Sequence, residues 1–159
     1  MLKSITDRII LPQRFQRKAS PEHGIPYLSS EDVFKINPEI TKFIPGLAPT
    51  TAQEYFVHRQ WLLLARSGQI YGLNGSCVLA TSWHEGKIVS EDVIRVVPHA
   101  EKVRPGYLVM VLGHPVFGRP LVVRLAFGTE VPHIAPEDLA EFPVVRLDPV
   151  DEAAIADAI

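Results

Sequence analysis

Proline and glycine interrupt this chain throughout its length and constrain its fold more than any other feature. The sequence of 159 residues contains 14 prolines and 10 glycines. Proline fixes its own φ angle and cannot continue a helix or a central strand, while glycine is favoured in turns. The sequence therefore predicts many short elements joined by loops. A chain of this length fits one domain with a single core, and we expect an α/β domain of the α+β kind.

The apolar residues form neither a membrane-spanning nor a secretory segment. No run of about 18 uncharged apolar residues occurs, although hydrophobic residues make up 47% of the chain. The N-terminus carries Lys3, Asp7 and Arg8 among its apolar residues and lacks a signal-peptide pattern. Cys77 is the only cysteine, so no intramolecular disulfide forms within this chain. We expect a cytoplasmic protein that has no membrane partner.

The charge is divided unevenly along the chain. The net charge of −2 combines +5 over residues 1–128, with 15 Lys and Arg against 10 Asp and Glu, and −7 over residues 129–159, with one against eight. The densest basic run consists of Lys3, Arg8, Arg14, Arg17 and Lys18, and Asp7 is the only acidic residue in that stretch of the sequence. Such a run indicates either a surface for nucleic acid or a solvated basic face, and the charge pattern leaves both open.

Hydrophobic patterning and turn residues predict the positions of the strands. Apolar or β-branched runs between turn signals favour short strands. An extended or strand entry over 2–11 is expected first, and the further predicted strands are 24–28, 61–65, 70–72, 78–83, 93–97, 121–127 and 144–147. Ser29 or Ser30 is expected to cap a helical turn that begins at Glu31 and Asp32.

Proline also marks where the helices are expected to begin. The predicted helices, each with a proline at or just before its start, are 107–112, 136–142 and 149–159. Proline suits the first turn of a helix because its missing amide hydrogen would have no partner there. The last helix is too short to be stable alone. We therefore expect a compact domain over 1–148, followed by the start of a longer connecting helix over 149–159.

Five short motifs occur in an order that resembles a known family. They are Gly24-Ile25-Pro26-Tyr27-Leu28, Trp61-Leu62-Leu63-Leu64-Ala65-Arg66-Ser67-Gly68, Ile70-Tyr71-Gly72, Pro105-Gly106-Tyr107-Leu108 and Gly128-Thr129. Together they resemble the target-recognition domain of type I restriction-modification specificity subunits, and residues 136–145 resemble the close of that domain. The chain departs from the family in having one domain where two are usual, and Trp61 where a Gly-Asp pair is common.

The resemblance implies DNA recognition rather than catalysis. A domain of this family reads one half of a split site on double-stranded DNA. It also positions two partners, an adenine methyltransferase subunit and a translocating restriction nuclease subunit. The implied fold is a twisted, mostly antiparallel sheet or partial barrel with short helices and long loops. On this interpretation the chemistry belongs to the partners.

Loop residues that combine positive charge with hydrogen-bonding groups are the DNA-binding candidates. Phosphate contacts hold a protein in register on DNA, while side chains at base edges read the sequence. The predicted phosphate-binding residues are Arg14, Arg17, Lys18 and Lys42. The predicted base-reading loop, which follows a buried strand, contains Arg66, Ser67, Gly68 and Gln69. Further candidates are Tyr71, Arg119 and Thr129. For each of them a structural or solvated role is the alternative.

Three other interpretations stand beside this one. An enzyme would need a catalytic or cofactor motif, yet Cys77 adjoins an apolar run and the six histidines lack metal-binding spacing. The sequence therefore predicts no catalytic residue, metal or cofactor. A protein-interaction module would use the same loops, and buried salt bridges at Arg14, Arg17 and Arg66 would favour it. The third is the recognition domain of a single-chain restriction and methylation enzyme.

Overall fold

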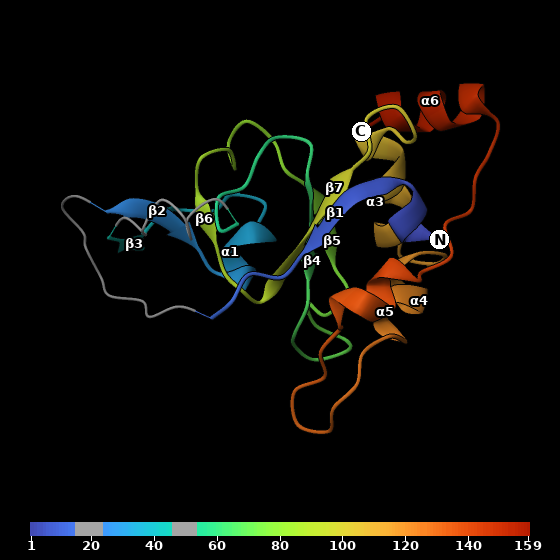
Figure 1. Cartoon of the computed structure of the whole chain (residues 1–159). Helices are drawn as coiled ribbons and strands as arrows, with labels where there is room; N and C mark the ends of the chain where they lie inside the picture. The colour runs from blue at the N-terminus through green and yellow to red at the C-terminus, as the bar shows by residue number, and fades with distance from the viewer. Residues whose placement is uncertain (15–23, 46–53) are drawn as a thin grey trace.

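A four-stranded sheet separates the larger helices from a second, smaller sheet (Figure 1). The computed structural model describes residues 1–14, 24–45 and 54–159. The strands are β1 (Thr6–Ile10), β2 (Ile25–Leu28), β3 (Phe43–Ile44), β4 (Leu62–Ala65), β5 (Cys77–Leu79), β6 (Ile88–Val89) and β7 (Val93–Pro98). The helices are the 3-10 helix η1 (Leu2–Ser4) and the α-helices α1 (Ser30–Val33), α3 (Pro105–Gly113), α4 (Arg119–Val123), α5 (Pro136–Ala140) and α6 (Pro149–Asp157).

The central sheet has the strand order β1-β7-β4-β5, and all neighbouring strands are antiparallel. Every residue of β4 is buried, as expected for a continuous apolar run that is covered on both faces. Leu62 and Leu64 pack in the cluster that α3 and α5 complete, whereas Leu63 packs with Leu28 and Val33 on the other face. Because side chains alternate along a strand, β4 contributes to two cores at once.

The smaller sheet is centred on β2, which is antiparallel to β3 and parallel to β6. The following helix α1 begins with a capping box. The side chain of Ser29 accepts from the amide of Asp32, and the side chain of Asp32 accepts from the amide of Ser29. This confirms the predicted cap. Strand pairing is mostly antiparallel, and no sheet closes into a barrel within the part of the chain that the structure describes. The α+β class with a mostly antiparallel sheet is therefore confirmed.

The last helix, α6, packs along α3. A Cβ atom at Gly106 would lie 2.6 Å from the carbonyl oxygen of Ala156, so glycine permits the two backbones to approach. Asp148 caps α6 by accepting from the amide of Val150 at 2.9 Å. Ahead of the helix, Arg146 contacts Glu152 at 2.7 Å. The boundary between residues 148 and 149 stays a prediction.

Three predicted strands, 70–72, 121–127 and 144–147, are wrong, and the one over 78–83 ends at residue 79. Residues 70–72 form turns because Gly68 and Gly75, with φ angles of 129° and 72°, reverse the chain on either side. Pro120 lies in the first turn of α4, which replaces the strand over 121–127. Residues 144–147 pair with no described strand, and the hydroxyl of Tyr107 donates instead to the Val145 carbonyl at 2.7 Å.

Candidate nucleic-acid interface

Two loops that are distant in sequence come together at one end of the central sheet. The first loop, residues 67–76, lies between Arg66, which directly follows β4, and the start of β5, and the second, residues 127–133, lies between α4 and α5. A β-bridge joins Ser67 in the first loop to His133 in the second. Both loops extend beyond the sheet on the same side (Figure 1). We call these two segments the loop pair.

Two polar side chains hold the loop pair in one arrangement. Asn74 is fully buried, and its Nδ2 donates to the carbonyls of Gly68 at 3.2 Å and Pro132 at 2.8 Å, one in each loop. Arg119 donates from Nη2 to three carbonyls of the first loop. These acceptors belong to Ile70, Gly72 and Asn74. Arg119 therefore braces the first loop, and its contact with DNA stays a prediction.

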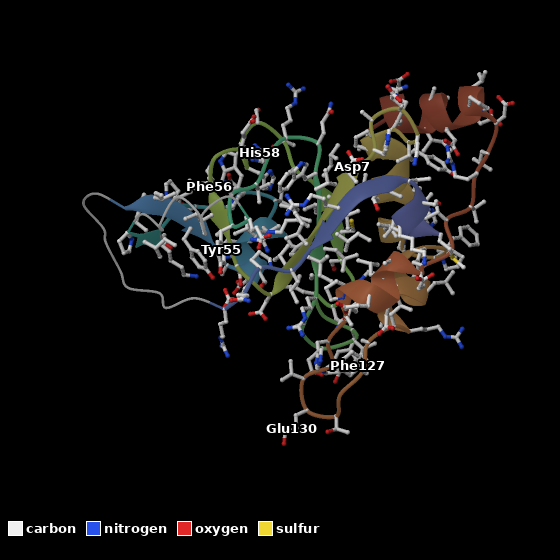
Figure 2. The ribbon with its side chains drawn as sticks, viewed as in Figure 1. Asp7, Tyr55, Phe56, His58, Phe127 and Glu130 are labelled. Carbon is white, nitrogen blue, oxygen red and sulfur yellow. The ribbon has the colours of Figure 1, made fainter. Side chains whose placement is uncertain are left out.

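The outer surface of the loop pair carries apolar and hydrogen-bonding side chains but no cation. Tyr71 is 89% exposed. The other exposed apolar side chains are Ile70, Phe127 and Val131, and the exposed polar ones are Gln69, Thr129 and Glu130. Figure 2 shows Glu130 at the far end of the pair and Phe127 nearer the sheet. Neither 67–76 nor 127–133 contains a lysine or arginine. Because exposed apolar side chains bordered by polar ones are typical of interaction surfaces, the loop pair is a candidate binding site.

Two candidate arginines lie beside the loop pair and contact one turn, residues 90–92. The amide of Arg66 donates to the Asp92 carbonyl at 3.0 Å. The Nε atom of Arg66 is buried without a hydrogen bond, and Arg66 makes no ion pair with any described residue. Arg14 is 88% exposed, and its Nε lies 3.5 Å from Oε1 of Glu91. The turn between β6 and β7 thus joins the basic run to the first loop.

A buried arginine supports this turn from within the core. Arg95 in β7 has no exposed surface, and its guanidinium donates to the carbonyls of Val89, Ser90 and Val93. Burial lowers the pKa of Arg95 to about 10, and the charge of Glu91 opposes that shift. Sequence reasoning missed this residue. Its only signal is a single cation within the otherwise apolar strand β7.

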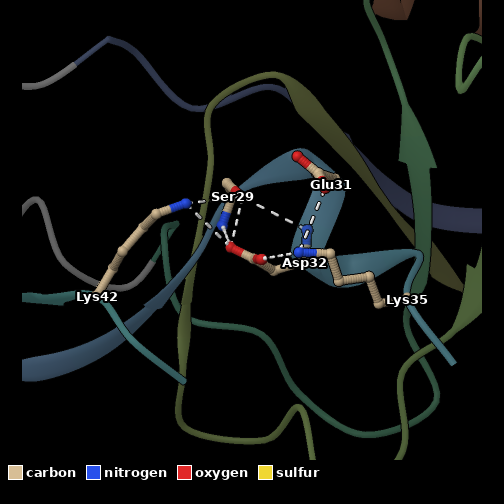
Figure 3. Close-up of polar contacts among 5 residues, drawn as sticks. All are labelled: Ser29, Glu31, Asp32, Lys35 and Lys42. Atoms are coloured by element: carbon tan, nitrogen blue, oxygen red, sulfur yellow. Dashed lines mark hydrogen bonds and ion pairs between the residues drawn. The ribbon is translucent and has the colours of Figure 1, made fainter. Parts of the chain in front are cut away.

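Lys42 lies in a different part of the molecule, next to β3 in the smaller sheet. Its Nζ is 3.3 Å from both Oγ of Ser29 and Oδ2 of Asp32 (Figure 3). Lys35 contacts the other oxygen of the same carboxylate at 3.1 Å. Burial raises the pKa of Asp32, but hydrogen bonds from Ser29, Lys35 and Lys42 outweigh burial and lower the pKa to about 2. The Lys42 ammonium is therefore engaged within the protein.

The structure brings together most of the predicted DNA-binding residues. The loop pair and its brace contain Ser67, Gly68, Gln69, Tyr71, Arg119 and Thr129, and Arg66 directly precedes the first loop. Arg14 adjoins them through the 90–92 turn, Lys42 does not, and Arg17 and Lys18 lie outside the described residues. The residues that sequence reasoning missed are Ile70, Asn74, Phe127, Glu130, Val131 and His133. The motif Gly128-Thr129 was the only signal for the second loop.

The described residues include no cluster of three or more His, Cys, Asp or Glu side chains that is suited to a metal ion. No helix formed by these residues has the length and apolar character to cross a bilayer. Cys77 packs against the larger core cluster, and burial raises the pKa of its thiol to about 12. A thiol with so high a pKa is a poor nucleophile because almost none of it is ionised at neutral pH.

No family model matches the chain, and no curated protein matches it. Among solved structures, the chain resembles the type I restriction-modification system S subunit from M. genitalium, with a TM-score of 0.67 and 14% identity over 99% of this chain and 36% of that one. It also resembles the HsdS subunit from Thermoanaerobacter tengcongensis, with a TM-score of 0.60 and 16% identity. That match covers 99% of this chain and 39% of the HsdS subunit. The chain thus has a fold found in these proteins and spans less than half their length.

Proposed function

We propose that this chain is a target-recognition domain of a type I restriction-modification specificity subunit, and that it reads one half of a split site on double-stranded DNA. One observation carries the proposal. A braced pair of loops with exposed hydrogen-bonding and aromatic side chains stands beside Arg14 and Arg66, on a fold found in S subunits. The match covers 99% of this chain but only 36% and 39% of the two S subunits, which supports its assignment to one domain of such a protein.

In this proposal the basic run holds the DNA backbone and the loop pair reads the bases. Arg14, Arg17 and Lys18 bind phosphates, because long cationic side chains make contacts that do not depend on sequence. Arg66 is fixed at its amide and presents its guanidinium to a guanine, where a bidentate contact is worth roughly 1–3 kcal/mol of discrimination. Gln69 is suited to an adenine edge, and Tyr71 to sugar or phosphate.

The assembly around the domain is also part of the proposal. Residues 1–148 read DNA, and residues 149–159 begin a connecting helix. The domain positions an adenine methyltransferase subunit and a translocating restriction nuclease subunit in the cytoplasm, and these partners carry out the chemistry. The greater length of the two solved S subunits supports further segments beyond a domain of this size.

The exposed apolar side chains of the loop pair favour a second candidate, a protein-interaction module. Buried ion pairs at the predicted arginines would have supported it. Instead, the side chain of Arg14 is almost fully exposed, and Arg66 has no ion-pair partner among the described residues. DNA recognition therefore accounts for more of the surface. A single-chain restriction and methylation enzyme would use this same DNA surface and differ only in an attached catalytic region.

A salt-dependent binding titration tests the proposal. The full chain is titrated with a fluorescent pool of random duplexes, and with duplexes enriched from that pool, between about 50 and 200 mM salt. Three phosphate contacts, from Arg14, Arg17 and Lys18, predict that log K falls with log salt with a slope of about −2.7, at −0.9 for each phosphate neutralised. Absence of salt-dependent binding in the wild-type chain would refute the proposal.

Two arginine variants separate base reading from general charge. Arg66→Ala should lower the ratio of enriched to random affinity by roughly 5- to 150-fold. Arg59→Ala is the matched control, because Arg59 is an exposed arginine before β4 whereas Arg66 follows β4. The control should leave the ratio unchanged. Equal ratios for the wild type and Arg66→Ala would show that Arg66 is not a base reader.

A further inference from the structure

The tip of the loop pair presents an isolated acid. Glu130 is exposed at the far end of the second loop (Figure 2). It makes no ion pair or hydrogen bond with any residue that the structure describes. A carboxylate without a neighbouring cation is unusual at a surface that meets DNA, since phosphates repel it. We therefore expect the Glu130 carboxylate to bind a specific group on the DNA that the tip contacts.

The second loop presents Glu130 from a closed and braced turn. The amides of Phe127 and His133 donate to each other's carbonyls at 3.0 and 2.9 Å, which closes the loop at its base. Their rings also pack together, with centroids 4.2 Å apart. Gly128 has a φ of +104°, a backbone conformation that favours glycine, and Asn74 ties the loop to its neighbour. The backbone position from which Glu130 extends is thus set by the fold.

The chemistry of a carboxylate restricts what it can bind on a duplex. It only accepts hydrogen bonds, and the groups on DNA that donate them in the major groove are the exocyclic amino groups of cytosine and adenine. Adenine places an acceptor, N7, beside its amino group, whereas the N4 amino group of cytosine has no such neighbour on that edge. Cytosine is therefore the better partner for an acid.

Resting on the proposed function, we propose that Glu130 is a specificity-determining residue that selects a cytosine by accepting a hydrogen bond from its N4 amino group in the major groove. In the proposed function Arg14, Arg17 and Lys18 bind the DNA backbone, so the tip of the loop pair does not need a cation for phosphate contacts. The phosphates of every duplex repel Glu130, and the hydrogen bond from a cytosine at this position offsets that repulsion. Neutralising it should consequently weaken selection while strengthening binding to random DNA.

Enrichment from a random duplex pool tests the inference in the full chain. The wild type should enrich cytosine at one position, and Glu130→Ala should lose that preference by roughly 5- to 150-fold while keeping the others. Glu130→Gln keeps an acceptor oxygen and gains an amide donor, so it should shift the preference at that position toward adenine. Both variants should bind random duplexes at least as tightly as the wild type does. The control is Glu85→Gln, which neutralises an exposed acid in the turn before β6 and should change neither result.

A modified base gives a second measurement. N4-methylcytosine at the selected position places a methyl group where the hydrogen bond would form, so it should weaken wild-type binding and leave Glu130→Ala unaffected. An unchanged preference profile in Glu130→Ala, or a lost preference for a base other than cytosine, would overturn the assignment while Arg66→Ala still supports DNA recognition. A wild-type chain that selects no sequence would overturn both proposals.

Discussion

Asp32→Asn removes the charge at the centre of the network that ties α1 to the smaller sheet. The Asp32 carboxylate accepts from the amide and hydroxyl of Ser29 and from the ammonium groups of Lys35 and Lys42 (Figure 3). Asparagine keeps the shape of the side chain but lacks the charge and one acceptor oxygen. We expect the variant to fold and to be less stable than the wild type.

The size of the loss follows from the pKa of Asp32. Folding lowers this pKa from its ordinary 3.8 to about 2, which corresponds to roughly 2.4 kcal/mol at 1.36 kcal/mol per pH unit. The Asp32 side chain is only 10% exposed, so water screens it weakly. Lys35 and Lys42 are about half exposed, so solvent screening reduces their contribution to the free energy of unfolding. We therefore expect a loss of about 2 kcal/mol at pH 7.

Urea unfolding of both proteins at several pH values measures this difference. Because the folded pKa is depressed, the stabilisation is fully present above pH 3.8 and is lost as the pH falls toward 2. The gap between wild type and Asp32→Asn should close over that range. Glu31→Gln is the control, since Glu31 lies on the same helix but is 73% exposed; it should cost less than about 0.5 kcal/mol. Equal losses in the two variants, or a gap that does not change with pH, would refute the reasoning.

Two further predictions concern the loop pair and the free thiol. Asn74→Ala leaves the carbonyls of Gly68 and Pro132 without this donor and should cost about 1–3 kcal/mol. Hydrogen exchange should accelerate in both loops and not in β7, and an effect confined to one loop would contradict the bracing role. Because burial raises the pKa of Cys77, a thiol reagent at pH 8 should label it much more slowly in the folded protein than in the urea-unfolded protein. Immediate stoichiometric labelling would contradict this.

Local sequence signals were sufficient for the elements that depend on their own residues. The apolar run of β4, the β-branched run of β7 and the capping serine of α1 all appear where the sequence predicted them. Pro105, Pro136 and Pro149 each occupy the first turn of a helix, as expected. Residues 144–147 have the same strand-forming composition but find no neighbouring strand, and no local pattern reveals whether a partner exists.

The loop pair was predictable only in part, for a related reason. Residues 66–69 follow a buried strand, and that is visible in the sequence. The second loop joins them through contacts such as the one from Asn74 to Pro132, which are 58 positions apart. Arg119 likewise looks like a free cation until the fold turns its guanidinium toward the first loop. Long-range hydrogen bonds of this kind leave no periodicity or composition that a single sequence displays.

The uneven charge of the chain bears directly on how such a domain would discriminate between sequences. Binding that rested on many phosphate contacts would be tight on any duplex, and the gain from correct bases would then be small in proportion. Here Arg95 is buried and Arg119 is bonded to carbonyls, so two of the arginines nearest the loop pair are held within the fold. Weak backbone binding leaves more of the affinity to base contacts at the tip. A short basic run and an acidic tip would therefore act in the same direction, toward selectivity at the expense of non-specific affinity.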